Sequence, residues 1–182
     1  MEQVTQSYVA LLRAINVGGK HILPMKHLVE MFCDARCVNV RSYIQSGNVV
    51  FSAPEKIAKG IPSLLEQQIE KRFGFPAPVI LRTRDELAKV ARGNPFLKAG
   101  APERELNVYF LAGQPSAAAV KSLDPQRSAP DRFQVIGREI YLHTPNGMGR
   151  TKLTSAYFDS KLKTVATARN WATVLKLLEM MG

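Results

Sequence analysis

The segment Asn146–Lys152 carries the residues of this sequence whose types and spacing are best suited to chemistry. It reads Asn-Gly-Met-Gly-Arg-Thr-Lys, which places two glycines, two cations and a hydroxyl just before a helix expected over residues 152–162. The free N–H groups and the dipole of a helix N-terminus attract anions. Arg150 is able to grip a phosphate with two N–H donors, and Lys152 adds a point charge. The segment predicts an anion site, and the alternative is an ordinary glycine turn in which Thr151 caps the helix.

A second glycine turn, Gly18-Gly19-Lys20, follows the first expected strand and precedes a helix. Backbone N–H groups in such a turn form concavities that bind anions. The turn lacks the spacing G-x-x-x-x-G-K-[ST] of a nucleotide-triphosphate loop. We interpret it as a structural turn, with a weaker anion or ligand site as the alternative.

The triplet Arg169-Asn170-Trp171 opens the last expected helix, where Asn170 is a suitable N-cap. Trp171 is either an anchor of the core or a platform on which a nucleic-acid base stacks. The candidate ligand-binding residues are therefore Arg13, Asn16, Lys20, Arg138, Arg150, Lys152, Arg169, Asn170 and Trp171. In this set the Arg and Lys side chains neutralise phosphate, and the Asn side chains hydrogen-bond sugar or base.

Other site chemistries find little support in the sequence. None of the histidines has an evident partner carboxylate and nucleophile, and Ser46 does not lie in a G-x-S-x-G elbow. His27, Cys33 and Cys37 are the conceivable zinc ligands, with both cysteines in one expected helix, but a fourth ligand and a standard spacing are missing. We therefore expect no metal and no cofactor, and we assign no catalytic residue.

The composition favours a basic globular protein. The chain has 182 residues, is 46% hydrophobic and carries a formal net charge of +10, which favours association with polyanions such as nucleic acid. The basic residues are scattered, so a merely solvated basic surface is the alternative. No apolar run approaches the roughly 18 residues of a membrane span, and no signal peptide is evident. With two cysteines expected to stay reduced, we expect a cytoplasmic protein without membrane contact.

The apolar periodicity predicts two α+β halves. In the first, strands are expected at 8–13, 40–51 and 78–81, and helices from about residue 24 through both cysteines, at 54–73 and at 83–92. In the second, strands are expected at 106–111, 133–142 and 165–168, and helices at 116–123, 152–162 and 170–181. Residues 40–51 are expected to form one long strand or a hairpin, and residues 133–142 a strand pair. With a hairpin in each half, the order is the β-α-β-β-α-β of ferredoxin-like units. We predict an N-terminal subdomain, residues 1–98, and a C-terminal subdomain, residues 99–182.

Five ordered blocks resemble the signature of the family known as domain of unknown function 1697. They are Leu11–Gly19, Tyr43–Phe51, Asn94–Phe96, Gly137–Leu142 and Thr167–Trp171. The resemblance extends over nearly the whole chain and implies two tandem subdomains partly like the ferredoxin fold, with some exchange of strands between them. It implies no established activity. Ala14 and Lys163 depart from the pattern, since each stands where the family usually has glycine.

Three functional hypotheses follow. The leading one is a cytoplasmic binding protein for a phosphate-bearing ligand or nucleic acid. The second is an enzyme that acts on a small anionic substrate in a cleft between the halves, and it ranks lower because no general base is evident. The third is a structural or protein-interaction role, in which the glycines and the Asn-Pro turn serve only the fold.

Overall fold

The computed structural model describes residues 4–182, which form two compact units. The first unit ends at Ala88 and also includes Lys176–Gly182, and the second is Lys89–Leu175. The boundary expected at residues 98 and 99 therefore falls inside the second unit. Each unit contains a four-stranded antiparallel sheet with helices, which confirms the α+β class.

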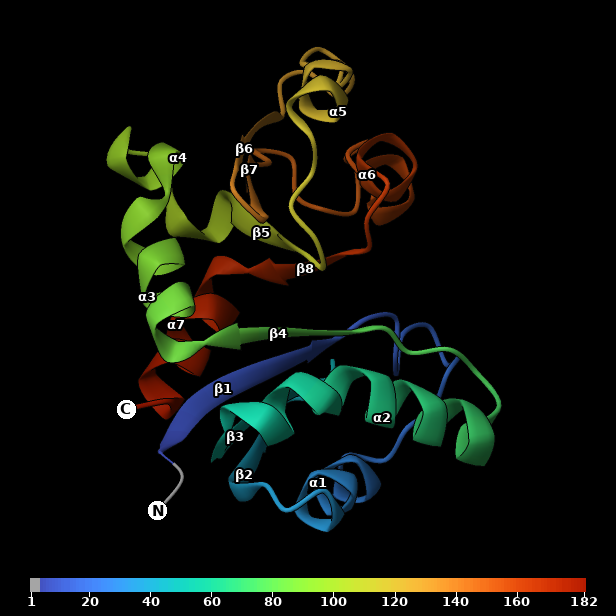
Figure 1. Ribbon diagram of the computed structural model, residues 1–182. Coiled ribbons are helices and arrows are strands. Elements are labelled where there is room, and N and C mark those ends of the chain that lie inside the picture. Colours follow the sequence, from blue (N-terminus) through green and yellow to red (C-terminus); the bar gives the residue numbers. More distant parts are fainter. Residues whose placement is uncertain (1–3) are drawn as a thin grey trace. The chain divides into compact units, whose positions relative to one another are not determined.

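The first unit has its strands in the order β2-β3-β1-β4. Its elements are β1 (Thr5–Leu12), α1 (Met25–Asp34), β2 (Val38–Tyr43), β3 (Asn48–Pro54), α2 (Glu55–Phe73) and β4 (Val79–Thr83), and α3 (Arg84–Gly93) follows. Helices α1 and α2 cover one face of this sheet (Figure 1). Because side chains alternate along a strand, Ala10, Leu12 and Phe51 meet these helices in one buried core.

The helix ends of the first unit follow from local chemistry. Gly74, with φ of 77°, ends α2 in the left-handed conformation that glycine adopts without strain. At the start of α3, the Thr83 N–H donates to Glu86 Oε2 at 2.8 Å and the Glu86 N–H donates to Thr83 Oγ1 at 3.2 Å. This reciprocal pair forms a capping box.

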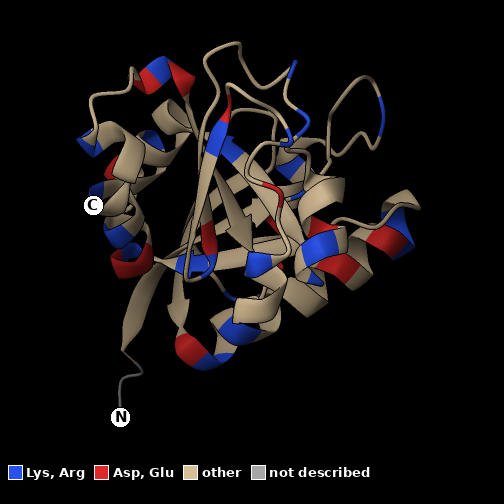
Figure 2. Ribbon diagram, turned by 90° about the horizontal axis from the view of Figure 1, so that it is seen from above, with Lys and Arg blue, Asp and Glu red and all other residues tan. Residues whose placement is uncertain are grey.

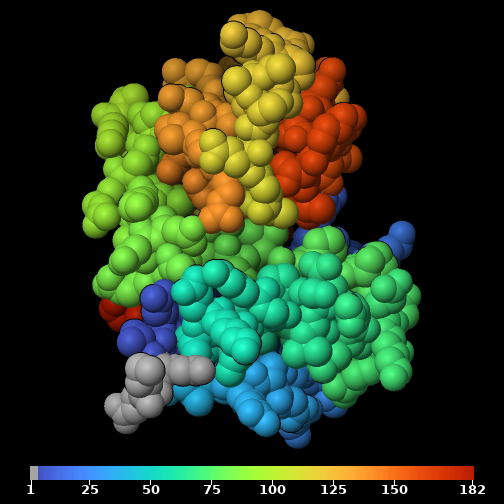
Figure 3. Space-filling model, viewed as in Figure 1, coloured from blue at the N-terminus to red at the C-terminus, as the bar shows by residue number. Residues whose placement is uncertain are grey.

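The second unit repeats the arrangement, with strand order β6-β7-β5-β8. Its elements are α4 (Pro95–Lys98), a 3-10 turn (Glu103–Glu105), β5 (Leu106–Leu111), α5 (Ala117–Lys121), β6 (Arg132–Ile136), β7 (Glu139–His143), α6 (Ser155–Leu162), β8 (Ala166–Asn170) and α7 (Trp171–Met180). Tyr109, Leu142 and Phe158 lie in the core beneath α5 and α6. In Figure 3 the yellow residues around α5 lie at the surface beside the red-orange residues of α6.

The expected exchange of strands is wrong for both sheets of the described chain. Each sheet is built from four consecutive strands, β1–β4 or β5–β8. The two edge positions of each sheet are filled by strands of the same unit, so neither sheet needs a strand from the other. Only the C-terminal segment 176–182 is separated in sequence from the rest of its unit.

The expectation that Cys33 and Cys37 share one helix is also wrong. Helix α1 ends at Asp34, and Arg36, with φ of 64°, turns the chain away before Cys37. Cys33 is exposed, whereas burial raises the pKa of the Cys37 thiol to about 11. Among residues 4–182 no group of three or more His, Cys, Asp or Glu side chains is placed to hold a metal ion.

Two of the signature blocks interlock at one end of the first sheet. Asn16 Nδ2 donates to the carbonyls of Leu23 and Gln45 at 2.9 and 2.8 Å, and Asn16 Oδ1 accepts from the Leu23 N–H at 2.8 Å. The Leu12 N–H donates to the Gly47 carbonyl at 2.8 Å. The loop after β1 and the turn between β2 and β3 are thereby tied together.

Ile44 in this turn is strained. It is a β-branched residue with φ of 49°, and its side chain is 52% exposed, so its burial offsets little of the strain. We expect Ile44→Asn to raise the free energy of unfolding by about 1 kcal/mol, because Asn tolerates the left-handed region. Urea denaturation measures this difference.

The matched control for Ile44→Asn is Val38→Asn. Val38 is 53% exposed but lies in β2, so the same polar replacement relieves no left-handed strain. Val38→Asn should raise the free energy of unfolding by at most about 0.5 kcal/mol. An Ile44→Asn protein no more stable than Val38→Asn would show that the turn stores no strain at this position.

No helix in the described part of the chain is both long enough and apolar enough to cross a membrane.

Candidate functional site

Two loops of the second unit, residues 122–131 and 144–154, are joined by hydrogen bonds and present cations to solvent. Arg127 Nε donates to the Lys152 carbonyl at 2.9 Å. The Lys152 N–H donates to Ser128 Oγ at 2.9 Å, and Thr151 Oγ1 lies 3.3 Å from the same hydroxyl. Arg127, Arg150 and Lys152 are all exposed. We call these two loops, with their three exposed cations Arg127, Arg150 and Lys152, the basic loop pair.

Arg127 is held in place by its surroundings. Its Cζ lies 4.1 Å from the centroid of the Tyr157 ring, and the Tyr157 hydroxyl accepts a hydrogen bond from the Asp124 N–H at 2.9 Å. Tyr157 itself is buried in the core, so the ring is a fixed support. With Nε bonded to Lys152, the two terminal amino groups of Arg127 remain to donate to an external acceptor. A guanidinium fixed in this way loses little side-chain entropy when it binds a phosphate.

The carboxylates of the same loop are used for internal bonds. Asp131 is buried and accepts from Ser128 Oγ at 2.7 Å. Asp124 Oδ1 accepts from the Gln126 N–H at 2.9 Å. These bonds shape the loop around Arg127, and the Asp131 charge faces inward to Ser128 rather than outward.

The start of α6 differs from the expectation that placed residues 146–152 against a helix N-terminus. The N-cap is Thr154, whose side chain accepts from the Tyr157 N–H at 3.2 Å, and the helix begins at Ser155. Thr151 Oγ1 instead accepts from the Leu153 N–H at 3.2 Å. Leu153 is buried in the core, which holds the chain outside the helix at this point. The anion site predicted here therefore rests on its cations rather than on the helix dipole.

The other predicted residues of the second unit lie apart from the basic loop pair. Arg138 lies in the turn between β6 and β7, at the opposite end of β7 from the loop 144–154. Arg169 is buried, and its Nη1 donates to Thr167 Oγ1 at 2.9 Å and to the Ala168 carbonyl at 2.7 Å. Burial lowers the pKa of Arg169 to about 10. Arg169 thus serves the interior of the unit.

Asn170 and Trp171 take structural positions at the start of α7. Asn170 Oδ1 accepts from the Thr173 N–H at 2.8 Å, which confirms the predicted N-cap. Trp171 is 1% exposed, so it is a core anchor and its ring offers no stacking surface. Both residues line a hollow of about 400 Å³, together with Glu103, Arg104 and Ala172.

The three predicted residues of the first unit lie in or beside the loop after β1. The amide of Asn16 is engaged by the bonds to Leu23 and Gln45. Lys20 is exposed at the tip, where its N–H donates to the Val17 carbonyl at 3.0 Å, and Arg13 is half-buried. The bonding of this loop is that of a structural turn, with the Lys20 side chain exposed at its tip.

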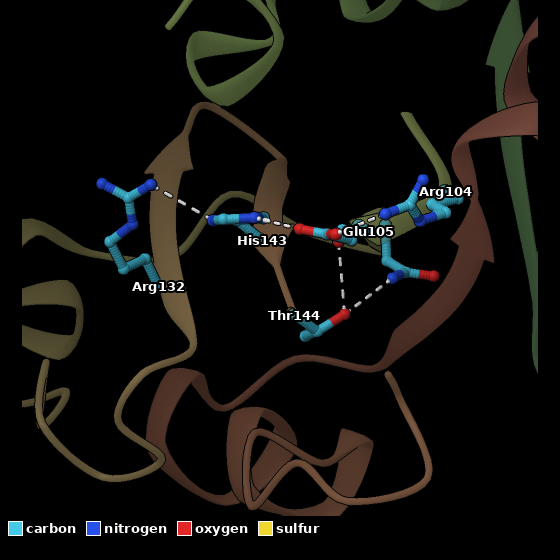
Figure 4. Close-up of polar contacts among 6 residues, drawn as sticks. Arg104, Glu105, Arg132, His143 and Thr144 are labelled. Atoms are coloured by element: carbon cyan, nitrogen blue, oxygen red, sulfur yellow. Dashed lines mark hydrogen bonds and ion pairs between the residues drawn. The ribbon is translucent and has the colours of Figure 1, made fainter. Parts of the chain in front are cut away.

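A polar network crosses the end of the second sheet at which β7 ends (Figure 4). Arg132 Nη2 lies 3.1 Å from His143 Nδ1, and His143 Nε2 lies 2.9 Å from Glu105 Oε2. Because Arg132 only donates and Glu105 accepts, the bonds assign a neutral imidazole with its proton on Nε2. Both ring nitrogens are engaged, so His143 has no free atom for a substrate.

Sequence reasoning missed the principal residue of the basic loop pair. Arg127 is a single arginine in an otherwise ordinary loop, and its support, Tyr157, is thirty residues further along the chain. No spacing in the sequence connects the two. Figure 2 shows Lys and Arg distributed along the ribbon and interleaved with Asp and Glu, so charge alone does not mark the site.

Comparisons with known proteins bear on the family and the fold. The family described as "Protein of unknown function (DUF1697)" matches residues 5–141. Among solved structures, the conserved bacterial protein SP0830 from Streptococcus pneumoniae is similar with a TM-score of 0.73 and 23% sequence identity, over 98% of this chain and 100% of that one. At this identity the similarity shows a shared fold alone. The search of curated proteins found no match.

Proposed function

Because the chain belongs to the DUF1697 family, whose description assigns no activity, we propose from its own residues that it binds a phosphate-bearing ligand or nucleic acid. The contacts are the guanidinium groups of Arg127 and Arg150 and the ammonium group of Lys152. Their charges neutralise phosphate oxygens, and the forked donors of arginine add bidentate hydrogen bonds. The net charge of +10 attracts a polyanion to the surface before contact.

The observation that carries this proposal is the fixed orientation of Arg127. An arginine that only solubilises a surface has no need of a buried ring beneath it and a carbonyl on its Nε. Here the Tyr157 ring lies at 4.1 Å and the Lys152 carbonyl at 2.9 Å, and the outer donors are left for a ligand. Preorganised donors of this kind are typical of phosphate recognition.

The hydrogen bonds of His143 favour a binding function over a catalytic one. A general base needs a ring nitrogen within reach of the substrate proton. Both His143 nitrogens are engaged with Arg132 and Glu105. The enzyme hypothesis therefore ranks below the binding hypothesis.

Two finer expectations accompany this proposal. Each unit is ferredoxin-like, which is supported by the β-α-β-β-α-β order and by the equivalent strand orders β2-β3-β1-β4 and β6-β7-β5-β8. The protein acts in the cytoplasm, which is supported by the free thiols of Cys33 and Cys37.

The test is a salt titration with a labelled DNA oligonucleotide followed by fluorescence anisotropy. With about three neutralised phosphates, affinity should fall about 40-fold between about 50 and 200 mM salt. The triple variant Arg127→Ala, Arg150→Ala and Lys152→Ala should lose most of the binding and flatten the slope of log K against log salt by about 2.7. Arg127→Lys should have an intermediate affinity, because it keeps the charge and loses the fork.

A matched control removes three exposed cations of α1 and α2, through Lys26→Ala, Lys56→Ala and Lys71→Ala. It changes the net charge equally and leaves the basic loop pair intact. The proposal fails if the control weakens binding as much as the triple variant does. The nucleic-acid part of the proposal also fails if no oligonucleotide binds to the folded protein at low salt.

A further inference from the structure

The positions of the aromatic rings and of the hollows limit the class of ligand that the basic loop pair can bind. Resting on the proposed function, we infer that the ligand is duplex nucleic acid, held by its phosphate backbone without regard to base sequence.

A polymer fits the basic loop pair better than a small nucleotide does. Small ligands bind in concave sites that bury most of their surface. Three hollows of the structure are lined by other residues, including Ser7, Arg41, Thr83 and Trp171. Arg127, Arg150 and Lys152 stand instead on exposed loops. A phosphate chain that runs across an exposed surface is able to engage all three at once.

The aromatic rings favour a duplex over a single strand. Proteins that bind single strands without sequence preference stack the bases on exposed aromatic side chains. The chain has eight phenylalanines, five tyrosines and one tryptophan, and all of them are buried except Tyr43, Phe73 and Phe133, which are half-buried. A duplex keeps its bases stacked on one another and displays only phosphates and groove edges. The exposed phosphates of a duplex are therefore the groups that the cations of the basic loop pair can bind.

A fourth cation lies on α6. Lys161 is exposed and lies four residues beyond Tyr157, the residue whose ring supports Arg127. Lys161 therefore adds a positive charge on the helix that holds Arg127 in place, and a phosphate backbone is long enough to reach more than one such charge.

The experiment compares three labelled probes in the anisotropy assay at low salt. They are a DNA duplex of about 20 base pairs, one of its strands alone, and a second duplex of unrelated sequence. The duplex should bind at least about fivefold more tightly than the strand, and the two duplexes should agree within about twofold. Lys161→Ala should lower the salt slope for the duplex by about 0.9, whereas Lys56→Ala in α2 should leave it unchanged.

The outcomes separate this inference from the function on which it rests. Tighter binding of the single strand, or a clear preference between the two duplexes, overturns the duplex inference. In that case a loss of binding in the triple variant of Arg127, Arg150 and Lys152 still supports the proposed function. An unchanged slope in Lys161→Ala removes the contribution of α6. Absence of binding to all three probes overturns the duplex inference and the nucleic-acid part of the proposed function.

Discussion

Replacing Gly47 with alanine is expected to lower the free energy of unfolding by about 2 to 5 kcal/mol. Gly47 has a φ of 79°, which strains any residue with a Cβ. A Cβ at this position would lie 2.7 Å from the Leu12 Cβ and 2.9 Å from the Ile15 Cδ1. Leu12 and Ile15 are both 1% exposed, so neither has space into which to withdraw. Urea denaturation followed by circular dichroism measures the loss.

Gly18→Ala is the matched control for this prediction. Gly18 also has a positive φ, of 59°, but nothing in the structure lies within 4 Å of the position that an added methyl group would occupy, and the residue is exposed. The control therefore carries the backbone strain alone, about 1 to 2 kcal/mol. If Gly18→Ala and Gly47→Ala cost the same, the close approach of the turn to Leu12 is not what requires glycine at position 47.

The elements that sequence reasoning placed well are those whose signals are local. Helix α2 ends at Phe73 as expected, and α3 and α7 begin close to the expected residues; the Gly74 end, the Thr83 cap and the Asn170 cap each depend on residues within four positions of one another. The family resemblance, which rests on short contiguous runs, is confirmed by the match over residues 5–141. Local features of this kind can be predicted directly from the sequence.

The misplaced features depend on contacts between distant segments. Helix α6 starts at Ser155 rather than Lys152 because Leu153 is drawn into a core formed by β5, β7 and α6. The interlock of Asn16 with Gln45 gives a structural role to a residue that the sequence offered as a ligand. The same limit hid Arg127, whose significance depends on the Tyr157 ring beneath it. Tertiary packing decides these cases, and no short pattern encodes it.

Replacing Trp171 with alanine is expected to cost about 3 to 5 kcal/mol of stability and to leave nucleic-acid binding unchanged in the protein that remains folded. Trp171 is 1% exposed at the first position of α7, so its removal leaves a large cavity at the start of this helix. Its role as a core anchor predicts a lower melting temperature. A stacking role would instead predict weaker binding of oligonucleotides at unchanged stability.

Trp171→Phe sharpens this test. Trp171 Nε1 is buried without a hydrogen-bond partner among the described residues, so phenylalanine forfeits no bond and loses only part of the ring volume. It should cost less than about 1.5 kcal/mol, which allows anisotropy measurements well below the melting temperature. Equal affinity in wild type and Trp171→Phe, with a loss in the Arg127, Arg150 and Lys152 triple variant, would assign binding to the loops and packing to the tryptophan. A loss of affinity in folded Trp171→Phe would instead show that the start of α7 contributes to the site, and the hollow beside Asn170 would then be the surface to probe.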